Sequence, residues 1–115
     1  LSFFENLDDI IDGVMINSEN WQALNTIKDK YRNQIQTVYT DPPFNVGKNA
    51  QYLYKVNYGD ATWMTMLENR LVLMHEFLDD TGNIFVNCDS HGNMYLRMLL
   101  DKIFKKLKVF KVSLS

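Results

Sequence analysis

Two short apolar runs separated by an amphipathic stretch constrain the fold of this chain most. Ile35 to Tyr39 is typical of a buried strand, and Ile84 to Val86 is a continuous apolar run typical of a strand covered on both faces. Between them, apolar residues recur at helical spacing in a segment that Asp60 can cap and Gly82 can end. A helix that joins two strands implies parallel pairing through a right-handed crossover. We therefore predict that the two runs are adjacent parallel strands.

The rest of the chain extends the same alternation of helices and strands. The spacing predicts helices over Phe3–Asp12, from a Ser18 cap through Tyr31, from Asp60 to Gly82, and from Ser90 to Leu107. It predicts strands over Val14–Ile16, Ile35–Tyr39 and Asn83–Cys88, and an edge strand or the start of a hairpin over Phe110–Leu114. The predicted fold class is α/β, with an open, mostly parallel sheet and helices on both faces.

In such sheets, ligands bind beyond the carboxyl ends of the strands. The segments in that position are Asn17–Glu19, Thr40–Phe44 and Cys88–Ser90. We expect all three to gather on one edge, which is where a functional site is predicted.

Composition limits the function further. The chain has 115 residues, of which 46% are hydrophobic, enough for one compact domain or a piece of a larger one. It has 12 basic and 14 acidic residues, so it lacks the overall positive field of a self-sufficient DNA binder, and any grip on nucleic acid must be local. The chain has a single cysteine, Cys88, no signal peptide and no apolar run of the ~20 residues that cross a bilayer. We therefore expect a cytoplasmic protein that does not bind a membrane.

The segment Asp41-Pro42-Pro43-Phe44, at the end of the first long strand, carries the clearest chemistry. Two prolines fix φ and donate no hydrogen, so the carbonyls before and between them stay free and rigidly aimed. The Asp41 carboxylate and the Pro42 carbonyl can accept both hydrogens of an exocyclic amino group, while Phe44 stacks on the base. A rigid turn that ends the strand would also account for the two prolines.

This segment resembles motif IV of the amino-methyltransferases, usually Asp-Pro-Pro-Tyr, with Phe44 in place of the tyrosine. The stretch from Ile16 to Leu24 is similar to the strand end and helix that precede the catalytic loop in permuted, β-class methyltransferases, including type III modification subunits. Those proteins usually have Gly-Asp or Gly-Glu there. Ser18 departs from the pattern, whereas Glu19 keeps an acid where family members touch the adenosine moiety of the donor. An ordinary acid in the first turn of a helix is the alternative for Glu19.

The resemblance implies a DNA adenine-N6 methyltransferase with a Rossmann-like sheet, acting on double-stranded DNA with S-adenosylmethionine as methyl donor. The target base must leave the duplex to be reached. The implied catalytic residues are Asp41, Pro42, Pro43 and Phe44, and the implied donor-binding residues are Glu19 and Asp41. A restriction subunit or a second copy of the chain is the implied protein partner.

Other polar residues carry weaker signals. Lys105, Lys106 and Lys108 can meet DNA phosphates, as Phe44 can meet the base, although a charged last helical turn explains the lysines equally well. Asp89 fits a capping or turn role better than a place in the pocket, and Trp63 fits the core. His75 and His91 have no clustered cysteine and no second histidine close by, so we predict no metal site.

Two features of the permuted family are missing from the sequence: the target-recognition region and the Phe-x-Gly-x-Gly turn that binds the donor. No Gly-x-Gly occurs in the chain. We therefore expect residues 1–115 to form a single, partial methyltransferase catalytic domain. Two alternatives remain open: N4-cytosine methylation, where Ser more often replaces Asp41, and an inactive interaction or assembly module derived from the same fold.

Overall fold

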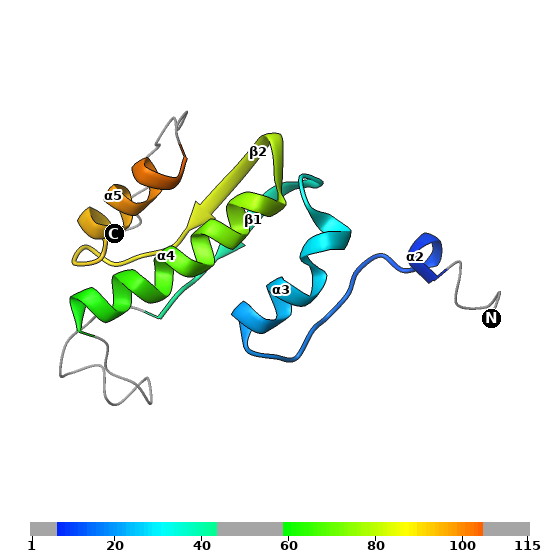
Figure 1. The fold of residues 1–115 in the computed structure, drawn as a ribbon, viewed down its shortest axis with the longest axis horizontal. Coiled ribbons are helices and arrows are strands. Elements are labelled where there is room, and N and C mark those ends of the chain that lie inside the picture. The colour runs from blue at the N-terminus through cyan, green and yellow to red at the C-terminus, as the bar shows by residue number, and fades with distance from the viewer. Residues whose placement is uncertain (1–6, 44–58, 105–115) are drawn as a thin grey trace.

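The computed structural model describes residues 7–43 and 59–104 of the chain. In order, the elements are α2 (Leu7–Ile10), α3 (Asn20–Tyr31), β1 (Ile35–Thr40), α4 (Asp60–Phe77), β2 (Leu78–Val86) and α5 (Asn93–Ile103) (Figure 1). The α/β class predicted from the sequence is confirmed. Most of the predicted loop over Asn45–Gly59 and the predicted strand over Phe110–Leu114 lie outside the described residues.

β1 and β2 form an open two-stranded parallel sheet, as predicted. Val38 pairs with Ile84, Tyr39 with Phe85, and Thr40 with Val86. Because α4 connects the two strands, the end of β1 and the end of β2 lie side by side on the same edge of the sheet.

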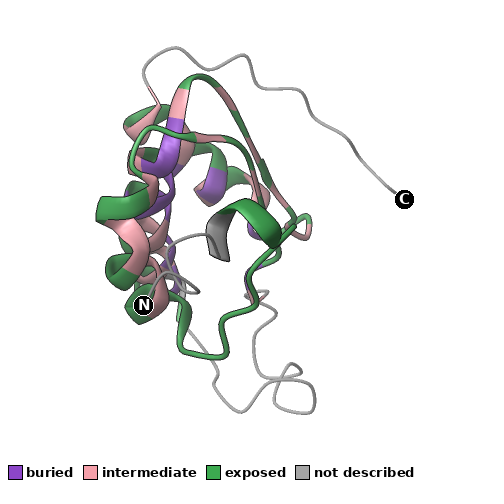
Figure 2. Ribbon diagram, turned by 90° about the vertical axis from the view of Figure 1, so that its right-hand side faces the viewer, coloured by how far each residue is buried: buried purple, intermediate pink, exposed green. Residues whose placement is uncertain are grey.

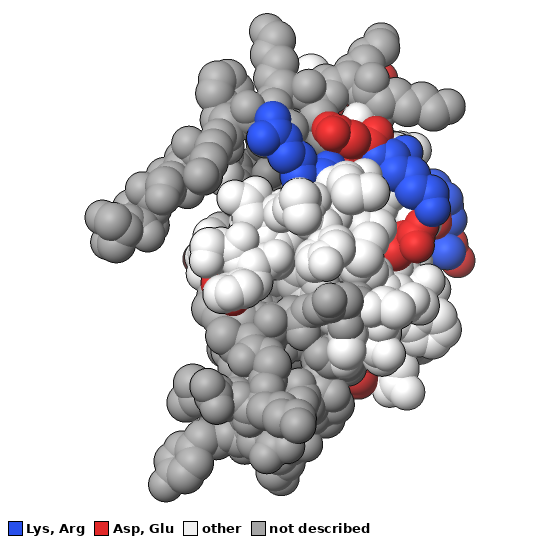
Figure 3. All heavy atoms as spheres, turned by 90° about the vertical axis from the view of Figure 1, so that its left-hand side faces the viewer, with Lys and Arg blue, Asp and Glu red and all other residues white. Residues whose placement is uncertain are grey.

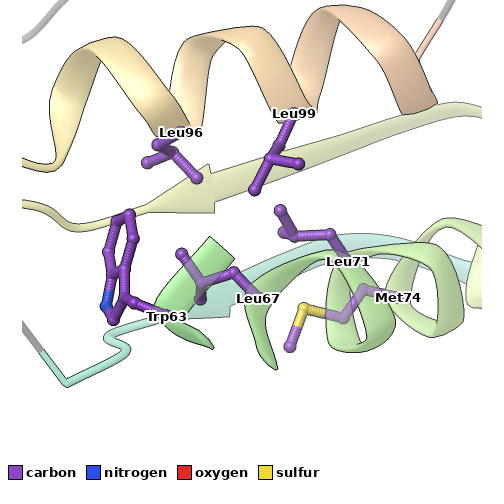
Figure 4. Packing of buried hydrophobic residues seen from close by; sticks show 6 residues of the cluster. All are labelled: Trp63, Leu67, Leu71, Met74, Leu96 and Leu99. Atoms are coloured by element: carbon purple, nitrogen blue, oxygen red, sulfur yellow. The ribbon is translucent and has the colours of Figure 1, made fainter. Parts of the chain in front are cut away.

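The helices α3, α4 and α5 form one layer, in which α4 contacts both neighbours. Side chains of α4 and α5 point toward one another to form the core (Figure 4), which consists of Trp63, Leu67, Leu71, Met74, Leu96 and Leu99. Val38, Ile84 and Val86 of the sheet pack against this cluster.

The opposite face of the sheet is open. The paired side chains of Tyr39 and Phe85 are 71% and 56% exposed, because alternate residues of a strand point to opposite faces. The sequence predicts helices on both faces, whereas the helices of the described part that pack on the sheet lie on one face, and buried residues concentrate there (Figure 2).

The helix predicted to run to Gly82 ends at Phe77, so that boundary is wrong. Leu78 continues the apolar spacing of α4, but it is the first residue of β2 and is buried there. The start of β2 is irregular, because Ile35 pairs with Leu78 whereas Thr37 pairs with Asn83. In this irregular part, Asp79 Oδ1 accepts hydrogen bonds from the N–H and the hydroxyl of Thr81, at 2.8 and 2.9 Å. A Cβ atom at Gly82 would lie 2.8 Å from Leu78 Cδ2 and 3.0 Å from the Ile35 carbonyl oxygen, so this position requires glycine.

The strand predicted over Val14–Ile16 is also wrong. This segment has no strand conformation and pairs with neither β1 nor β2 (Figure 1). Met15 in it is 97% exposed. The helix predicted over Phe3–Asp12 is described only as α2, Leu7–Ile10.

Two predicted caps are displaced by one or two positions. The cap of α3 is Glu19 rather than Ser18, because its carboxylate reaches the free N–H groups of the first turn. α5 begins after Gly92 rather than at Ser90, since Ser90, His91 and Gly92 form the turn before it. In the ranges described, no helix is long and apolar enough to cross a membrane.

Candidate functional site

A pocket of about 210 Å³ opens at the carboxyl edge of β1. It lies where three elements meet: the start of α3, the end of β1 and one side of α4. Its lining residues are Glu19, Asn20, Thr40, Asp41, Pro42, Pro43, Met66, Leu67, Arg70, Leu71 and Met74. The pocket therefore brings Glu19 together with the Asp41-Pro42-Pro43 segment, although the two are far apart in the sequence and Glu19 does not follow a strand.

Asp41 is exposed and is oriented by the neighbouring strand end. The Asn87 N–H donates to the Thr40 carbonyl at 2.9 Å, which continues the parallel ladder by one step. The Asn87 side-chain amide then donates to Asp41 Oδ1 at 3.1 Å. Since Asn87 engages Oδ1, the second carboxylate oxygen can accept a hydrogen from a ligand.

The two prolines after Asp41 are held by packing and by one hydrogen bond. Pro42 is buried and Pro43 is half-buried. The Pro43 carbonyl accepts a hydrogen bond from the Trp63 indole N–H at 2.7 Å. That bond uses the carbonyl of the second proline and does not involve the Pro42 carbonyl, for which the sequence predicts a ligand.

Glu19 combines a helix-capping role with a place in the pocket. Its Oε2 accepts from the backbone N–H groups of Trp21 and Gln22 at 2.9 and 3.2 Å. Its Oε1 pairs with Arg70 Nη2 at 2.5 Å. The hydrogen bond from Arg70 is the main reason that the pKa of Glu19 lies below the ordinary value of a glutamate, and the two backbone N–H groups lower it further. Glu19 is therefore ionised at neutral pH.

Arg70 is fixed from three sides. Besides Glu19, its Nε donates to Asn20 Oδ1 at 2.6 Å and its Nη1 donates to the Met66 carbonyl at 3.1 Å. A guanidinium with this many directed bonds holds its partners in one geometry. The polar wall of the pocket is therefore preorganised.

The acid at the end of β1 and the two prolines after it therefore line the same pocket as the ionised Glu19. A family model described as DNA methylase matches residues 35–112, which include β1, α4, β2 and α5. The chain belongs to the DNA methylase family.

Several curated methylases are similar to the chain. It is 34% identical over 95 residues to the probable type III restriction-modification enzyme HindVI Mod subunit of Haemophilus influenzae, a match that covers 83% of this chain and 13% of that protein. It is 31% identical over 100 residues to the type II methyltransferase M.EcaI of Enterobacter cloacae, covering 83% and 22%. It is 34% identical over 79 residues to the type II methyltransferase M.KpnI of Klebsiella pneumoniae, covering 61% and 18%. The chain thus spans less than a quarter of the length of each of these relatives.

Two residues after β2 lie outside the pocket of this family member. Asp89 Oδ1 accepts from the Gly92 N–H at 2.8 Å, which confirms the turn role predicted for it. Burial, followed by the nearby Asp89 charge, raises the pKa of the Cys88 thiol. Cys88 is therefore protonated at neutral pH and is not prepared to act as a nucleophile.

Several of the described basic residues are paired with acidic side chains. Lys28 and Arg32 pair with Glu76, and Lys102 pairs with Glu68 at 2.6 Å. Basic and acidic side chains alternate along the border of the face shown in Figure 3, next to a wide uncharged area. The remaining predicted site residues, Phe44, Lys105, Lys106 and Lys108, lie outside the described residues. His75 and His91 are exposed, and in the described part no three His, Cys, Asp or Glu residues gather as metal ligands would.

Sequence reasoning missed Arg70 and Asn87 and saw only the packing role of Trp63. Asn87 could have been found, because the predicted parallel pairing places the residue after the second strand beside Asp41. Arg70 gave no such signal, since a basic residue on an amphipathic helix is ordinarily exposed.

Proposed function

We propose that the full-length protein is a DNA methyltransferase that transfers a methyl group from S-adenosylmethionine to the N6 amino group of an adenine extruded from the duplex. One observation carries this proposal: Asp41 and Pro42 both line the pocket that contains Glu19. Membership of the DNA methylase family supports it.

The pocket suits the donor in its chemistry. The ionised Glu19 carboxylate can accept hydrogen bonds from hydroxyl or ammonium groups, while Met66, Leu71 and Met74 offer apolar surface to the adenine ring and the methylene groups. Glu19, Asp41 and the apolar side of α4 would hold the donor. When bound, S-adenosylmethionine would supply a methyl group already activated by the sulfonium charge.

The residues of this chain would then align the target amino group. The second carboxylate oxygen of Asp41 and the Pro42 carbonyl accept one amino hydrogen each, which turns the nitrogen lone pair away from them. Because both acceptors sit on a rigid strand end, the alignment is set before the base arrives. The Asp41 carboxylate also provides an acceptor for the proton that the methylated nitrogen loses.

The choice of adenine over cytosine rests on Asp41, because N4-cytosine enzymes more often carry Ser at that position. N4-cytosine methylation is the second candidate, since the same two acceptors would fit its amino group. The family name covers both N6 and N4 methylation. An inactive assembly module is the third candidate.

The test is nucleoside analysis. The full-length protein is incubated with duplex DNA and isotope-labelled S-adenosylmethionine, and the digested nucleosides are separated. We expect labelled N6-methyladenine. Labelled N4-methylcytosine would select the second candidate, and the absence of any labelled base would favour the module.

The name of the Haemophilus influenzae relative, a Mod subunit of a type III restriction-modification enzyme, suggests the class of protein partner. We propose a restriction subunit or a second copy of the protein. Purification of the tagged full-length protein, followed by identification of the proteins bound to it, would show which of the two binds.

A further inference from the structure

Trp63 is the residue of α4 that joins the hydrophobic core to the Asp41–Pro43 segment. It is fully buried, with 0% exposure, within the cluster formed by α4 and α5. Its one polar side-chain atom, Nε1, donates to the Pro43 carbonyl at 2.7 Å. An indole in a core can satisfy its N–H in many ways, and here it does so on the backbone of the candidate catalytic segment.

The hydrogen bond matters because the segment has few others available. Pro42 and Pro43 have no N–H groups, so neither residue can donate to the ladder or to a side chain. The backbone of these two prolines can be held by hydrogen bonds only through their carbonyls. If the Pro42 carbonyl is reserved for a ligand, the Pro43 carbonyl is the acceptor of these two prolines that remains to fix the segment, and Trp63 donates to it.

The indole ring is itself held from the opposite direction. Gly92 lies so close that a Cβ atom there would be 2.9 Å from Trp63 Cη2 and 3.3 Å from Cζ2. Gly92 in turn is fixed by its N–H, which donates to Asp89 Oδ1 at 2.8 Å. The turn after β2 therefore sets the position of the ring, and the ring sets the position of the Pro43 carbonyl.

We propose that Trp63 is a positioning residue for methyl transfer, which aims the Asp41–Pro43 segment through its indole N–H. This inference rests on the proposed function. Asp41 then has two independent anchors: Asn87 orients its carboxylate from β2, and Trp63 holds the backbone that follows it. Losing one neutral hydrogen bond that stabilises the transition state lowers the rate by about three- to tenfold.

The sharpest variant replaces Trp63 in the full-length protein by 3-benzothienylalanine, which keeps the shape of tryptophan but has sulfur in place of the N–H. We expect kcat to fall about three- to tenfold, with the KM for the donor changed by less than about twofold. Hydrogen exchange of the Asn87 amide, which donates to the Thr40 carbonyl just before Asp41, should become faster.

Three controls accompany it. The same replacement at Trp21, whose side chain is 46% exposed, should change neither kcat nor exchange. Leu99→Val perturbs the same core cluster without touching Pro43, so it should lower the melting temperature and leave kcat unchanged. Trp63→Phe, made by ordinary mutagenesis, should combine both effects.

The proposal would be overturned if the replacement at position 63 changed neither kcat nor the hydrogen exchange of the Asn87 amide. A lower melting temperature without either change would show a purely structural hydrogen bond and would overturn it as well. If the unmodified protein methylates no DNA, the proposed function fails, and Asn87 exchange alone then decides whether Trp63 holds the segment.

Discussion

Replacing Gly92 by alanine tests how tightly the turn after β2 is packed against Trp63. The added Cβ would lie 2.9 Å from Trp63 Cη2 and 3.2 Å from Asp89 Oδ1. Gly92 has φ −75° and ψ −21°, a conformation open to any residue, so alanine brings no backbone strain. The cost therefore comes from the contact alone.

The contact cannot be relieved cheaply. Trp63 is fully buried and its Nε1 is bonded to Pro43, so the ring can move away from position 92 only by disturbing the core or that bond. Overpacking of this kind costs about 1 to 3 kcal/mol. We expect Gly92→Ala to destabilise the protein by that amount and also to lower the rate of methyl transfer.

Gly59→Ala is the matched control. Gly59 caps α4 as Gly92 caps α5, neither through a side-chain bond, and its φ of −67° also suits alanine. No described atom lies within 4 Å of a Cβ at Gly59. Both variants therefore lose the stability that alanine costs at an N-cap. The difference in stability between them measures the contact of position 92 with Trp63.

The assay compares melting temperatures and initial rates of the two variants in the full-length protein. A difference of about 1 to 3 kcal/mol corresponds to a shift of several degrees for a domain of ordinary size. Equal melting temperatures and equal rates for the two variants would show that the ring has room to move, and the reasoning about Trp63 would be wrong.

Three further outcomes are expected in the full-length protein. Asp41→Ala should abolish methyl transfer, since it removes the carboxylate that Asn87 orients. The melting temperature should stay unchanged, because the Asp41 side chain is exposed; an active variant would remove Asp41 from its role. Phe44→Ala should weaken retention of the extruded base by about 1 to 3 kcal/mol and be partly rescued by an adenine opposite an abasic site, whereas Phe44→Tyr should be nearly silent; a low melting temperature without rescue would make Phe44 structural. Because the pKa of Glu19 is lowered, chiefly by Arg70, donor binding should be complete above the ordinary glutamate pKa and be lost only as the pH falls through the lowered value. Arg70→Ala should move that loss to higher pH in calorimetric titrations of S-adenosylhomocysteine, and an unmoved midpoint would contradict the pairing.

The sequence predicts well the parts of the fold in which apolar residues recur at regular spacing. Ile84 to Val86 is apolar throughout and α4 has a regular apolar side, so the parallel pairing of β1 and β2 followed from the crossover rule alone. Boundaries were less predictable. Leu78 fits the period of α4 and the buried start of β2 equally well, and the irregular start of β2, where Thr81 donates to Asp79, decides between them.

Val14 to Ile16 shows why a short apolar run is weak evidence for a strand. Three apolar residues form a strand only where a neighbour supplies backbone partners, and sequence spacing does not reveal the neighbour. In the candidate site, the Asp41 segment was predictable because two consecutive prolines after a strand are chemically distinctive. Arg70 was not, because its partner Glu19 is 51 positions away.

The parallel register has a consequence for how the protein acquires its active geometry. Asp41 and Asn87 are 46 positions apart, so the bond between them requires a long segment to be closed at a cost in chain entropy. Helices such as α4 and α5 use local bonds and form early, whereas pairing between distant strands limits the folding rate. A refolding chain can therefore regain its helical circular dichroism before its carboxylate is aligned. Recovery of methyl transfer, followed against time, would report the closing of the β1–β2 ladder and not the return of the helices.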